Sequence, residues 1–433
     1  MSPGNPSRGR GSATRQKSPR IRAIGPRWCA RGEPRDTLGT RAALCYPLVV
    51  ELRSSVAHHA FDREAFADLC RRVVTGELEP AANRLAKAPT PLAVPPVDVR
   101  SSTGPEAAAR AELGLAALRA GKVAVLVLNG GMATRFGGGA KGVVPVVDGH
   151  SRTSFLAVKL AEVERRAETL GCAIPVVLMH SFATEATSRA HVEAVDWAGL
   201  RKDDRYWFSQ SIMPRVLPDG TPLASLPEAA DFDDATLYAA PGHGDTLARL
   251  RSSGTLATLR SRGVEHILIS NVDNVGASLD PVVLGAHLQA AGRGAAVSVE
   301  VVRRLAGDAG GCVADLPGGR PAIIEGFRLP VGTDLADFPH FNTNTLWLVA
   351  AEMDRDFGLT WFAVRKKIAW PGGGEREVVQ FEQLIGQVTE FAPSAFLDVD
   401  RETRFLPIKT REDLAVARPR LEAFARSVGL ADE

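Results

Sequence analysis

A strand-length apolar run that ends abruptly in glycine constrains the fold of this chain more than any other stretch. Residues 123–128 read VAVLVL, and six of the fourteen residues at 129–142 are glycine. A continuous apolar run of this length is typical of a strand buried on both faces of a parallel sheet. Glycine lets the loop bend sharply so that backbone N–H groups converge on an anion, and Arg135 and Lys141 are its only charged residues. The stretch therefore predicts a buried strand followed by a loop that binds a phosphate chain.

Similar apolar runs alternate with helical patterns along the rest of the chain. Strands are expected at 174–179, 206–208, 266–270 and 295–302, with more strand and turn at 312–348. Helices are expected from Asp62 to near Gly76, from Thr103 to Gly121, from 153 to 170 and onward from 184. Strands that alternate with helices predict an α/β fold whose doubly wound, mostly parallel sheet has right-handed crossovers.

Three local patterns add detail that a structure can test. Thr103 and Glu106 have the spacing of a capping box, with Pro105 in the first helical turn. Residues 143–147 after the glycine loop are expected to form a short strand. Residues 88–100 contain four prolines and predict a linker.

Composition and charge limit the partners of the chain. Its longest apolar runs are strand-sized, far below the ~20 residues of a membrane span, so no membrane insertion is expected. Ten of the Lys and Arg residues lie within 1–42 beside only two acids, which leaves the body mildly acidic and does not favour nucleic acid. The five cysteines are odd in number, widely spaced and without a CxxC pair, which favours a reducing, cytoplasmic location.

Within the glycine loop, two familiar motifs fit poorly. Residues 137–142 satisfy GxGxxG, but eight residues separate them from the strand and the apolar VVPVV follows. The dinucleotide fingerprint needs its glycines directly after a strand and at the start of a helix, so we interpret this match as accidental. The order Ala140-Lys141-Gly142 also lacks the Ser or Thr of a P-loop. A flexible surface loop is the alternative interpretation.

Other candidate site residues lie in turns. Asp273 comes just after the apolar run HILIS, where ligands of open α/β sheets bind, and its carboxylate could hold Mg2+. An Asx-type turn is the alternative. His243 lies between two glycines, and Asn342 and Asn344 offer amides that suit sugar hydroxyls. Lys409 offers a mobile charge for phosphate. Each of these residues alone also fits a structural role.

Taken together, these stretches resemble the UTP–glucose-1-phosphate uridylyltransferase family, the eukaryotic-type UDP-glucose pyrophosphorylases. Eight segments follow the family order between 125 and 410: LNGG, PVVLMHSF, FSQSIMPR, APGHGD, ISNVDN, FNTNTLW, VVQFEQLIG and RFLPIKT. The resemblance implies a nucleotide-diphospho-sugar transferase (Rossmann-like) fold. It also implies Mg2+ and the reaction of UTP with glucose 1-phosphate to give UDP-glucose and pyrophosphate.

The resemblance assigns a role to each matching position. It implies nucleotide binding by Leu128, Asn129, Gly130, Gly131, Gln210, Gly242 and Asn271. It implies catalytic cations at Arg135, Lys141 and Lys409, sugar-phosphate binding by His243, Glu325, Asn342 and Asn344, and metal binding by Asp273. A phosphate oxygen of the sugar would attack the α-phosphorus in line, so the task is to align polyanions rather than to supply a base.

This chain departs from the family pattern in places. Ala133 stands where the family has glycine, and Lys141-Gly142 aligns better with the related UDP-N-acetylhexosamine pyrophosphorylases. Only 24 residues follow Lys409, so a C-terminal β-helix and oligomerisation through it are not expected. The alternatives are a pyrophosphorylase for another sugar 1-phosphate, such as galactose or N-acetylhexosamine 1-phosphate, and a non-catalytic nucleotide-binding homologue. A dinucleotide oxidoreductase is disfavoured by the position of GxGxxG.

The expected organisation has four parts. Residues 1–42 are rich in Arg, Ser, Gly and Pro and predict a disordered basic tail, with a targeting peptide as the alternative. Residues 43–120 predict an N-terminal helical segment, 121–410 the nucleotidyltransferase domain, and 411–433 a short C-terminal helix. The expected partners are UTP and a sugar 1-phosphate, and the sequence leaves the oligomeric state open.

Overall fold

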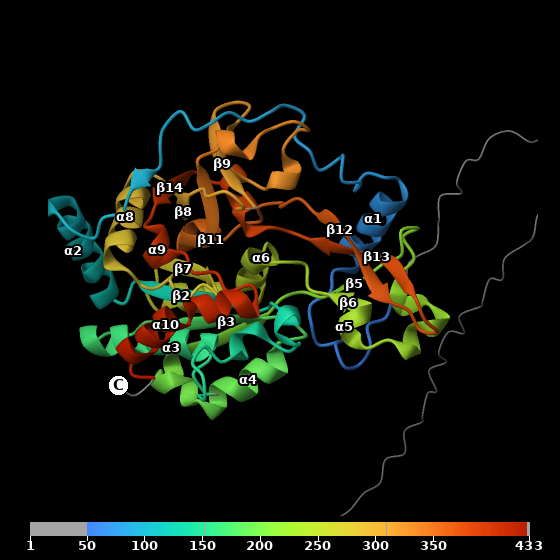
Figure 1. Cartoon of the computed structure of the whole chain (residues 1–433), viewed down its shortest axis with the longest axis horizontal. Helices are drawn as coiled ribbons and strands as arrows, with labels where there is room; N and C mark the ends of the chain where they lie inside the picture. The colour runs from blue at the N-terminus through green and yellow to red at the C-terminus, as the bar shows by residue number, and fades with distance from the viewer. Residues whose placement is uncertain (1–49, 151, 309, 431–433) are drawn as a thin grey trace, which may run out of the picture. The chain divides into compact units, whose positions relative to one another are not determined.

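A computed structural model of the chain describes residues 50–150, 152–308 and 310–430. The tail predicted at 1–42 lies outside the described residues, and the other predicted domain boundaries stay predictions. The described chain is built on a large sheet (Figure 1). The main path of this sheet runs in the order β1 (Val97–Asp98), β14 (Ser394–Asp398), β8 (Val297–Arg303), β11 (His340–Val349), β7 (His266–Asn271), β2 (Val123–Leu128), β3 (Val176–His180) and β4 (Arg205–Ser209).

The sheet is mostly parallel, as the alternation of strands and helices predicts. Strands β7, β2, β3 and β4 run parallel to one another, and so do β1, β14 and β8. Strand β11 lies antiparallel between β8 and β7. Its other contact is with β9 (Cys312–Leu316), which pairs with β10 (Arg320–Ile324). The carboxyl ends of β7, β2, β3 and β4 therefore meet at one edge, beside the beginning of β11.

Helices cover both faces of this sheet. The α-helices of the described chain are α1 (Arg63–Val74), α2 (Pro105–Arg119), α3 (Phe155–Leu170), α4 (Glu185–Ala194), α5 (Asp234–Leu237), α6 (Asp245–Ser252), α7 (Thr255–Ser261), α8 (Pro281–Gly292), α9 (Arg401–Arg404) and α10 (Arg411–Ser427), and α1 and α5 lie away from the large sheet. Side chains of β2 alternate between two cores. Val123, Val125 and Val127 share one core with residues of α2, α3, α8 and α10, and Leu126 shares the other with residues of α6 and α7. The sheet is therefore doubly wound.

Two small sheets stand apart from the large one. Strands β12 (Phe362–Ala369) and β13 (Glu375–Glu382) form an antiparallel hairpin, and β5 (Met213–Pro214) pairs with β6 (Tyr238–Ala239). The hairpin packs Val379 and Phe381 against Phe66 and Leu69 of α1. Figure 1 shows α1, β5 and β6 gathered around the hairpin. In the described part of the chain, no helix is both long and apolar enough to cross a membrane.

Several helix ends follow their sequence signals. Asp62 caps α1 by accepting a hydrogen bond from the backbone N–H of Ala65 at 2.9 Å. Ser154 caps α3, which ends at Gly171 in a left-handed conformation with φ +62°. These caps confirm the predicted helices because polar side chains satisfy N–H groups that the first turn leaves free.

The predicted capping box of α2 is wrong. The residue before the helix is Gly104, and no side chain caps this end. The Thr103 hydroxyl instead lies 3.2 Å from the hydroxyl of Ser101, and Glu106 forms an ion pair with Arg110 one turn later. Local partners thus compete successfully for both side chains.

Two other local expectations also fail. Residues 143–147 form no strand: Lys141–Val143 is a 3-10 turn, and Pro145 makes only an isolated bridge with Ser154. Proline cannot donate to a ladder, and the apolar run packs Val146 into the core instead. Residues 88–100 are more than a linker, because Thr90 bridges Asp315 and β1 pairs with β14.

Candidate active site

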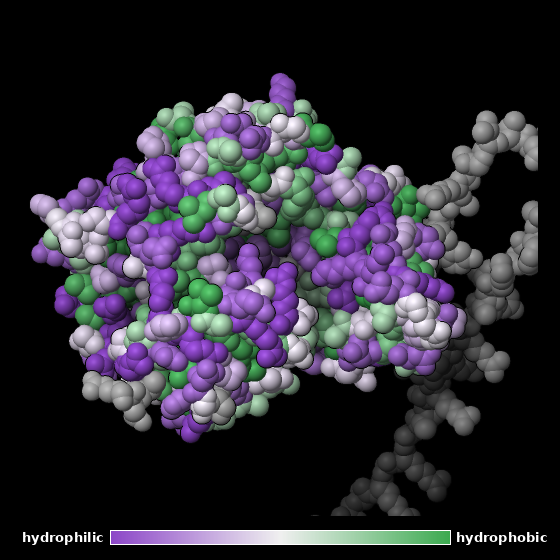
Figure 2. Space-filling view, viewed as in Figure 1, coloured by the Kyte–Doolittle hydropathy of each residue, from purple (hydrophilic) through white to green (hydrophobic). Residues whose placement is uncertain are grey.

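A cleft of about 550 Å³ opens at the strand-end edge of the large sheet. Figure 2 shows the surface hollowed between the part that holds the large sheet and the part that holds β12 and β13. Nine of the sequence-predicted site residues line the cleft: Leu128, Gly130, Gly131, Lys141, Gln210, Gly242, His243, Asn271 and the metal candidate Asp273. Parallel strands therefore bring together residues that are up to 145 positions apart, from Leu128 to Asp273.

The glycine loop closes on itself directly after β2. Backbone hydrogen bonds join Ala133 to Gly139 at 2.8 Å and Lys141 to Gly131 at 3.0 Å. Residues 137–139 all have positive φ, between +78° and +103°, which only glycine adopts readily. Ala133, the departure from the family, has φ −84° and is buried, so the loop accommodates its methyl group.

The cationic candidates gather around a second hollow next to the cleft. Its volume is about 120 Å³, and Arg135, Lys141 and Lys409 all line it together with Thr134. Lys141 and Thr134 line both hollows. Lys141 also forms an ion pair with Asp273, and both side chains are mostly buried. The structure thus places the three predicted catalytic cations and the predicted metal ligand in one neighbourhood.

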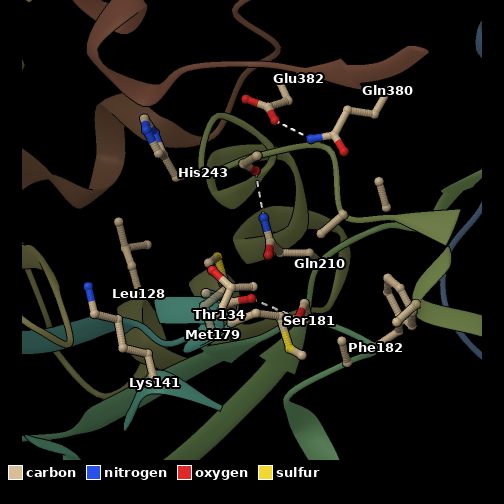
Figure 3. A pocket seen from close by; sticks show the side chains of 18 of the residues that line it. Leu128, Thr134, Lys141, Met179, Ser181, Phe182, Gln210, His243, Gln380 and Glu382 are labelled. Atoms are coloured by element: carbon tan, nitrogen blue, oxygen red, sulfur yellow. Dashed lines mark hydrogen bonds between the residues drawn. The ribbon is translucent and has the colours of Figure 1, made fainter. Parts of the chain in front are cut away.

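Two hydrogen bonds connect the chain segments at the base of the cleft. The Gln210 side chain follows β4 and donates a hydrogen bond to the carbonyl of Gly242 at 2.5 Å. In Figure 3, Gln210 lies between Lys141 on one side and Phe182 on the other, with His243 across the cavity. The Ser181 hydroxyl donates to the carbonyl of Gly130 at 2.9 Å. These contacts join the ends of β2, β3 and β4 to the turn at 241–245.

His243 is held in one protonation state. Its Nδ1 accepts a hydrogen bond from the backbone N–H of Ile385 at 3.0 Å. Burial lowers the pKa of His243 to about 4, because the charged ring loses its solvation. The ring is therefore neutral at physiological pH, and its proton lies on Nε2, which is left to donate.

A bulge in β11 brings two asparagines toward Asn271. The pairing of β11 with β8 shifts between Asn342 and Thr345, and Asn344 has a left-handed φ of +59°. Its Nδ2 donates to Oδ1 of Asn271 at 3.0 Å, while its own N–H donates to Oδ1 of Asn342 at 2.9 Å. Strained backbone of this kind is concentrated at functional sites. The Asn344 Oδ1 is buried and has no hydrogen-bond partner among the described residues.

Four predicted residues line neither the cleft nor the cationic hollow: Asn129, Glu325, Asn342 and Asn344. Asn129 is fully buried, and its amide nitrogen bonds Ser188 at 2.8 Å and lies 3.1 Å from Nδ1 of His180. Its side chain thus braces β2 against α4 and the end of β3. Glu325 and Asn342 lie near each other beside Gly311. Burial raises the pKa of the Glu325 carboxyl.

The opposite wall contains residues that the sequence analysis missed. Lys366 of β12 and Gln380 and Glu382 of β13 line the cleft, together with Thr134, Ser181, Phe182, Arg215 and Tyr238. Figure 3 shows Gln380 and Glu382 across the cavity from Met179 and Ser181. The segment VVQFEQLIG, part of the resemblance, contains Gln380 and Glu382 and was the available signal.

Known proteins resemble this chain in sequence. A family profile described as UTP–glucose-1-phosphate uridylyltransferase matches residues 98–427, well over half of the chain. The chain belongs to the UTP–glucose-1-phosphate uridylyltransferase family. UTP–glucose-1-phosphate uridylyltransferase 2 of Dictyostelium discoideum is 30% identical over 316 residues, which are 71% of this chain and 61% of that protein. The chain spans less than two thirds of the first two relatives' own length, 61% and 58%.

Solved structures of two kinds share the family fold. The uridine diphosphate N-acetylglucosamine pyrophosphorylase of Trypanosoma brucei matches with a TM-score of 0.69 and 20% identity, over 85% of this chain and 77% of that one. A variant of the UDP-glucose pyrophosphorylase of Leishmania major, in complex with UDP-glucose, matches with a TM-score of 0.63 and 25% identity, over 81% and 76%. These matches bear out the predicted nucleotidyltransferase-type α/β fold.

Proposed function

We propose that this chain transfers a uridylyl group from UTP to glucose 1-phosphate and releases pyrophosphate. One observation carries the proposal: Arg135, Lys141 and Lys409 line one hollow that adjoins a cleft at the carboxyl ends of parallel strands. Open α/β sheets bind ligands at such ends, and three cations match the charge of a triphosphate tail. Family membership supports the same reaction.

Different residues of the cleft are suited to the base and to the phosphates of the substrates. Gln210 and the turn at Gly242 offer amide and backbone groups suited to a base edge, and Arg135, Lys141 and Lys409 neutralise phosphate charge. An oxygen of the sugar phosphate attacks the α-phosphorus of UTP, and the bond from that phosphorus to the pyrophosphate oxygen breaks. The nucleophile is already an anion, so alignment and charge neutralisation supply the catalysis. His243 is neutral and can donate from Nε2 without adding charge.

Mg2+ is part of this proposal. Among the described residues, Asp273 belongs to no group of three metal-ligating side chains. One carboxylate nevertheless fits Mg2+, which is commonly held by one or two carboxylates and by substrate phosphates. Asp273 would hold the ion in place of its ion pair with Lys141, in the cleft that Asn271 also lines. Bound there, the ion would neutralise phosphate charge.

The proposal also covers which sugar 1-phosphate is the natural substrate. Galactose 1-phosphate and N-acetylglucosamine 1-phosphate are the competing substrates, and a nucleotide-binding protein without turnover is the competing class. Asn344 contacts the cleft residue Asn271, and Asn342 accepts a hydrogen bond from the N–H of Asn344; amides of this kind suit unmodified hydroxyls. Glucose 1-phosphate is therefore the expected best substrate.

The test measures pyrophosphate release from UTP with each of the three sugar 1-phosphates, with Mg2+ and with EDTA. We expect turnover to be fastest with glucose 1-phosphate and to be lost with EDTA. A preference for another sugar would change the substrate but keep the reaction class. Binding of UTP without turnover on any sugar would favour the non-catalytic alternative and reject the proposal.

A cytoplasmic location is also proposed. Cys70, Cys172 and Cys312 are all free in the structure, which fits a compartment that keeps thiols reduced. Fractionation of the native protein tests this, and recovery from an oxidising compartment would reject it.

A further inference from the structure

The turn that carries Asp273 is tied to the segment that carries Lys409. Asn274 follows Asp273 and is 1% exposed. Its Oδ1 accepts a hydrogen bond from the backbone N–H of Leu406 at 2.9 Å, and its Nδ2 donates to the carbonyl of Arg404 at 3.2 Å. One amide thus satisfies a donor and an acceptor of the neighbouring backbone, as a β-bridge would.

The two backbones approach closely on both sides of this amide. The N–H of Ile408 lies 3.4 Å from the carbonyl of Asp273. A side chain at Gly276 would place its Cβ 2.7 Å from the carbonyl oxygen of Thr403, too close for any residue but glycine. The Arg404 side chain anchors the start of the segment through a buried ion pair with Glu300 at 2.6 Å. The segment therefore has little freedom to shift relative to the turn.

The ammonium group of Lys409 depends on this backbone for its position. Within the described residues, it has no hydrogen-bond or ion-pair partner, and only the backbone of Lys409 is fixed. The N–H groups of Lys409 and Thr410 both donate to the Asp413 carboxylate at 2.8 Å, in the cap of α10. Asp413 therefore holds the segment from one side, and Asn274 holds it from the other.

We propose that Asn274 is a positioning residue that sets the place of the Lys409 ammonium relative to the Asp273 carboxylate. Asn274 lines neither the cleft nor the cationic hollow, so it acts through its neighbours. The inference rests on the proposed function, in which Lys409 and Asp273 act on the same phosphate chain. A shift of about 1 Å in such a group can lower the rate by about 100-fold. The link between the turn and the segment should therefore affect the rate of turnover.

A double-mutant cycle with Lys409→Ala separates positioning from general destabilisation. We expect Asn274→Ala to lower kcat at least about tenfold in the wild-type background but less than twofold in the Lys409→Ala background, because no ammonium remains to be misplaced. Equal losses in both backgrounds would reject the proposal. Asn274→Asp keeps the acceptor for the Leu406 N–H. Its kcat is measured in the same double-mutant cycle, in case Asn274→Ala does not fold.

The matched control removes a buried hydrogen bond elsewhere in the core. Ser298→Ala deletes the partner of His287 Nδ1, which lies 2.9 Å away. This variant should lower the melting temperature while kcat stays within twofold. If it lowers kcat as much as Asn274→Ala does, the effect of Asn274 is only one of stability and the proposal fails.

Amide hydrogen exchange tests the link without any turnover. In Asn274→Ala, exchange across residues 404–410 should rise at least about tenfold, while α3 is unchanged. Unchanged exchange at 404–410 would overturn the inference even if the enzyme is a uridylyltransferase. Faster exchange in a protein that turns over none of the three sugar phosphates would leave the link intact and reject the proposed function.

Discussion

The two walls of the cleft differ in how the chain supports them. The first wall is made of the ends of β2, β4 and β7, and every residue of β2 is buried in the sheet. The second wall is the hairpin of β12 and β13, whose central residues 365–367 are exposed. A two-stranded hairpin is marginally stable alone and depends here on Val379 and Phe381 packing against α1.

This difference suggests that the two walls contribute to different steps, the first to catalysis and the second to ligand binding. Groups that must be placed within a fraction of an ångström work best on rigid elements, and the first wall holds Lys141, Asp273 and Gln210. The second wall, with its lower local stability, is suited to contacts that bind and release ligand. Removing a residue of the first wall should therefore lower kcat, and removing one of the second wall should raise KM.

The largest effect is expected for Asp273→Ala. The variant loses the only carboxylate next to Lys141 within the described cleft edge, so turnover should fall by about 1,000-fold. The melting temperature should change by only about 1 °C, the shift that a cost near 1 kcal/mol gives a chain of this size. Pyrophosphate release and thermal unfolding measure the two quantities. Full activity in this variant would remove Asp273 from the mechanism.

Lys141→Ala should have the next largest effect. Loss of a cation that stabilises charge in the transition state lowers kcat by about 100-fold. The matched control is Lys122→Ala, which removes an exposed ion pair with Glu265 at the far end of β2 and should leave kcat unchanged. If the two variants behave alike in steady-state kinetics, the phosphate-binding lysine has been assigned to the wrong position.

Lys366→Ala tests the second wall. Lys366 lines the cleft from β12, and its neighbour Lys367 is exposed on the same strand without lining it. We expect Lys366→Ala to raise KM for UTP about tenfold while kcat changes less than threefold, because it removes a contact made equally in the ground and transition states. Lys367→Ala should match the wild type. A kcat loss as large as that of Lys141→Ala would abolish the proposed distinction between the walls.

The first wall was predictable because its signals are local. A strand-length apolar run followed by glycine places Lys141, and HILIS followed by a polar turn places Asp273, so the parallel sheet brings both to one edge. The doubly wound sheet followed from the same alternation. Short strands and caps were less predictable, as 143–147 and Thr103 illustrate, because tertiary contacts and neighbouring hydroxyls decide them.

The second wall was not predictable from local patterns. Lys366 and Glu382 are more than 200 residues from Leu128 in sequence, and their hairpin is held by tertiary packing, including that against α1. Asn129 illustrates the opposite difficulty. The resemblance assigns it to the nucleotide, but its amide is used inside the core. A motif identifies which residues matter without saying which of them face the ligand, and the roles of these residues stay predictions.

The smallest effect is expected from a change of pH, which tests whether the first wall shields His243 from solvent. Burial lowers the pKa of His243 to about 4 and that of His180 to about 4, whereas an unfolded histidine titrates near 6.5. At saturating substrate, kcat should therefore change less than twofold between pH 8 and pH 6. Between pH 6.5 and 4 the unfolded chain binds more protons, so stability falls as pH falls, by at most about 1.4 kcal/mol per pH unit for each histidine.

Urea unfolding at pH 7 and pH 5 measures this loss of stability. The hairpin 362–382 contains no histidine, so none of this loss comes from the side chains of the hairpin itself. Because the Nδ1 of His243 accepts from Ile385, the neutral ring must persist for that hydrogen bond to form. A step in kcat near pH 6.5 that disappears in His243→Asn would mean that the ring titrates as it does in water. The turn at 241–245 would then be open to solvent, and the first wall would be no more rigid than the second.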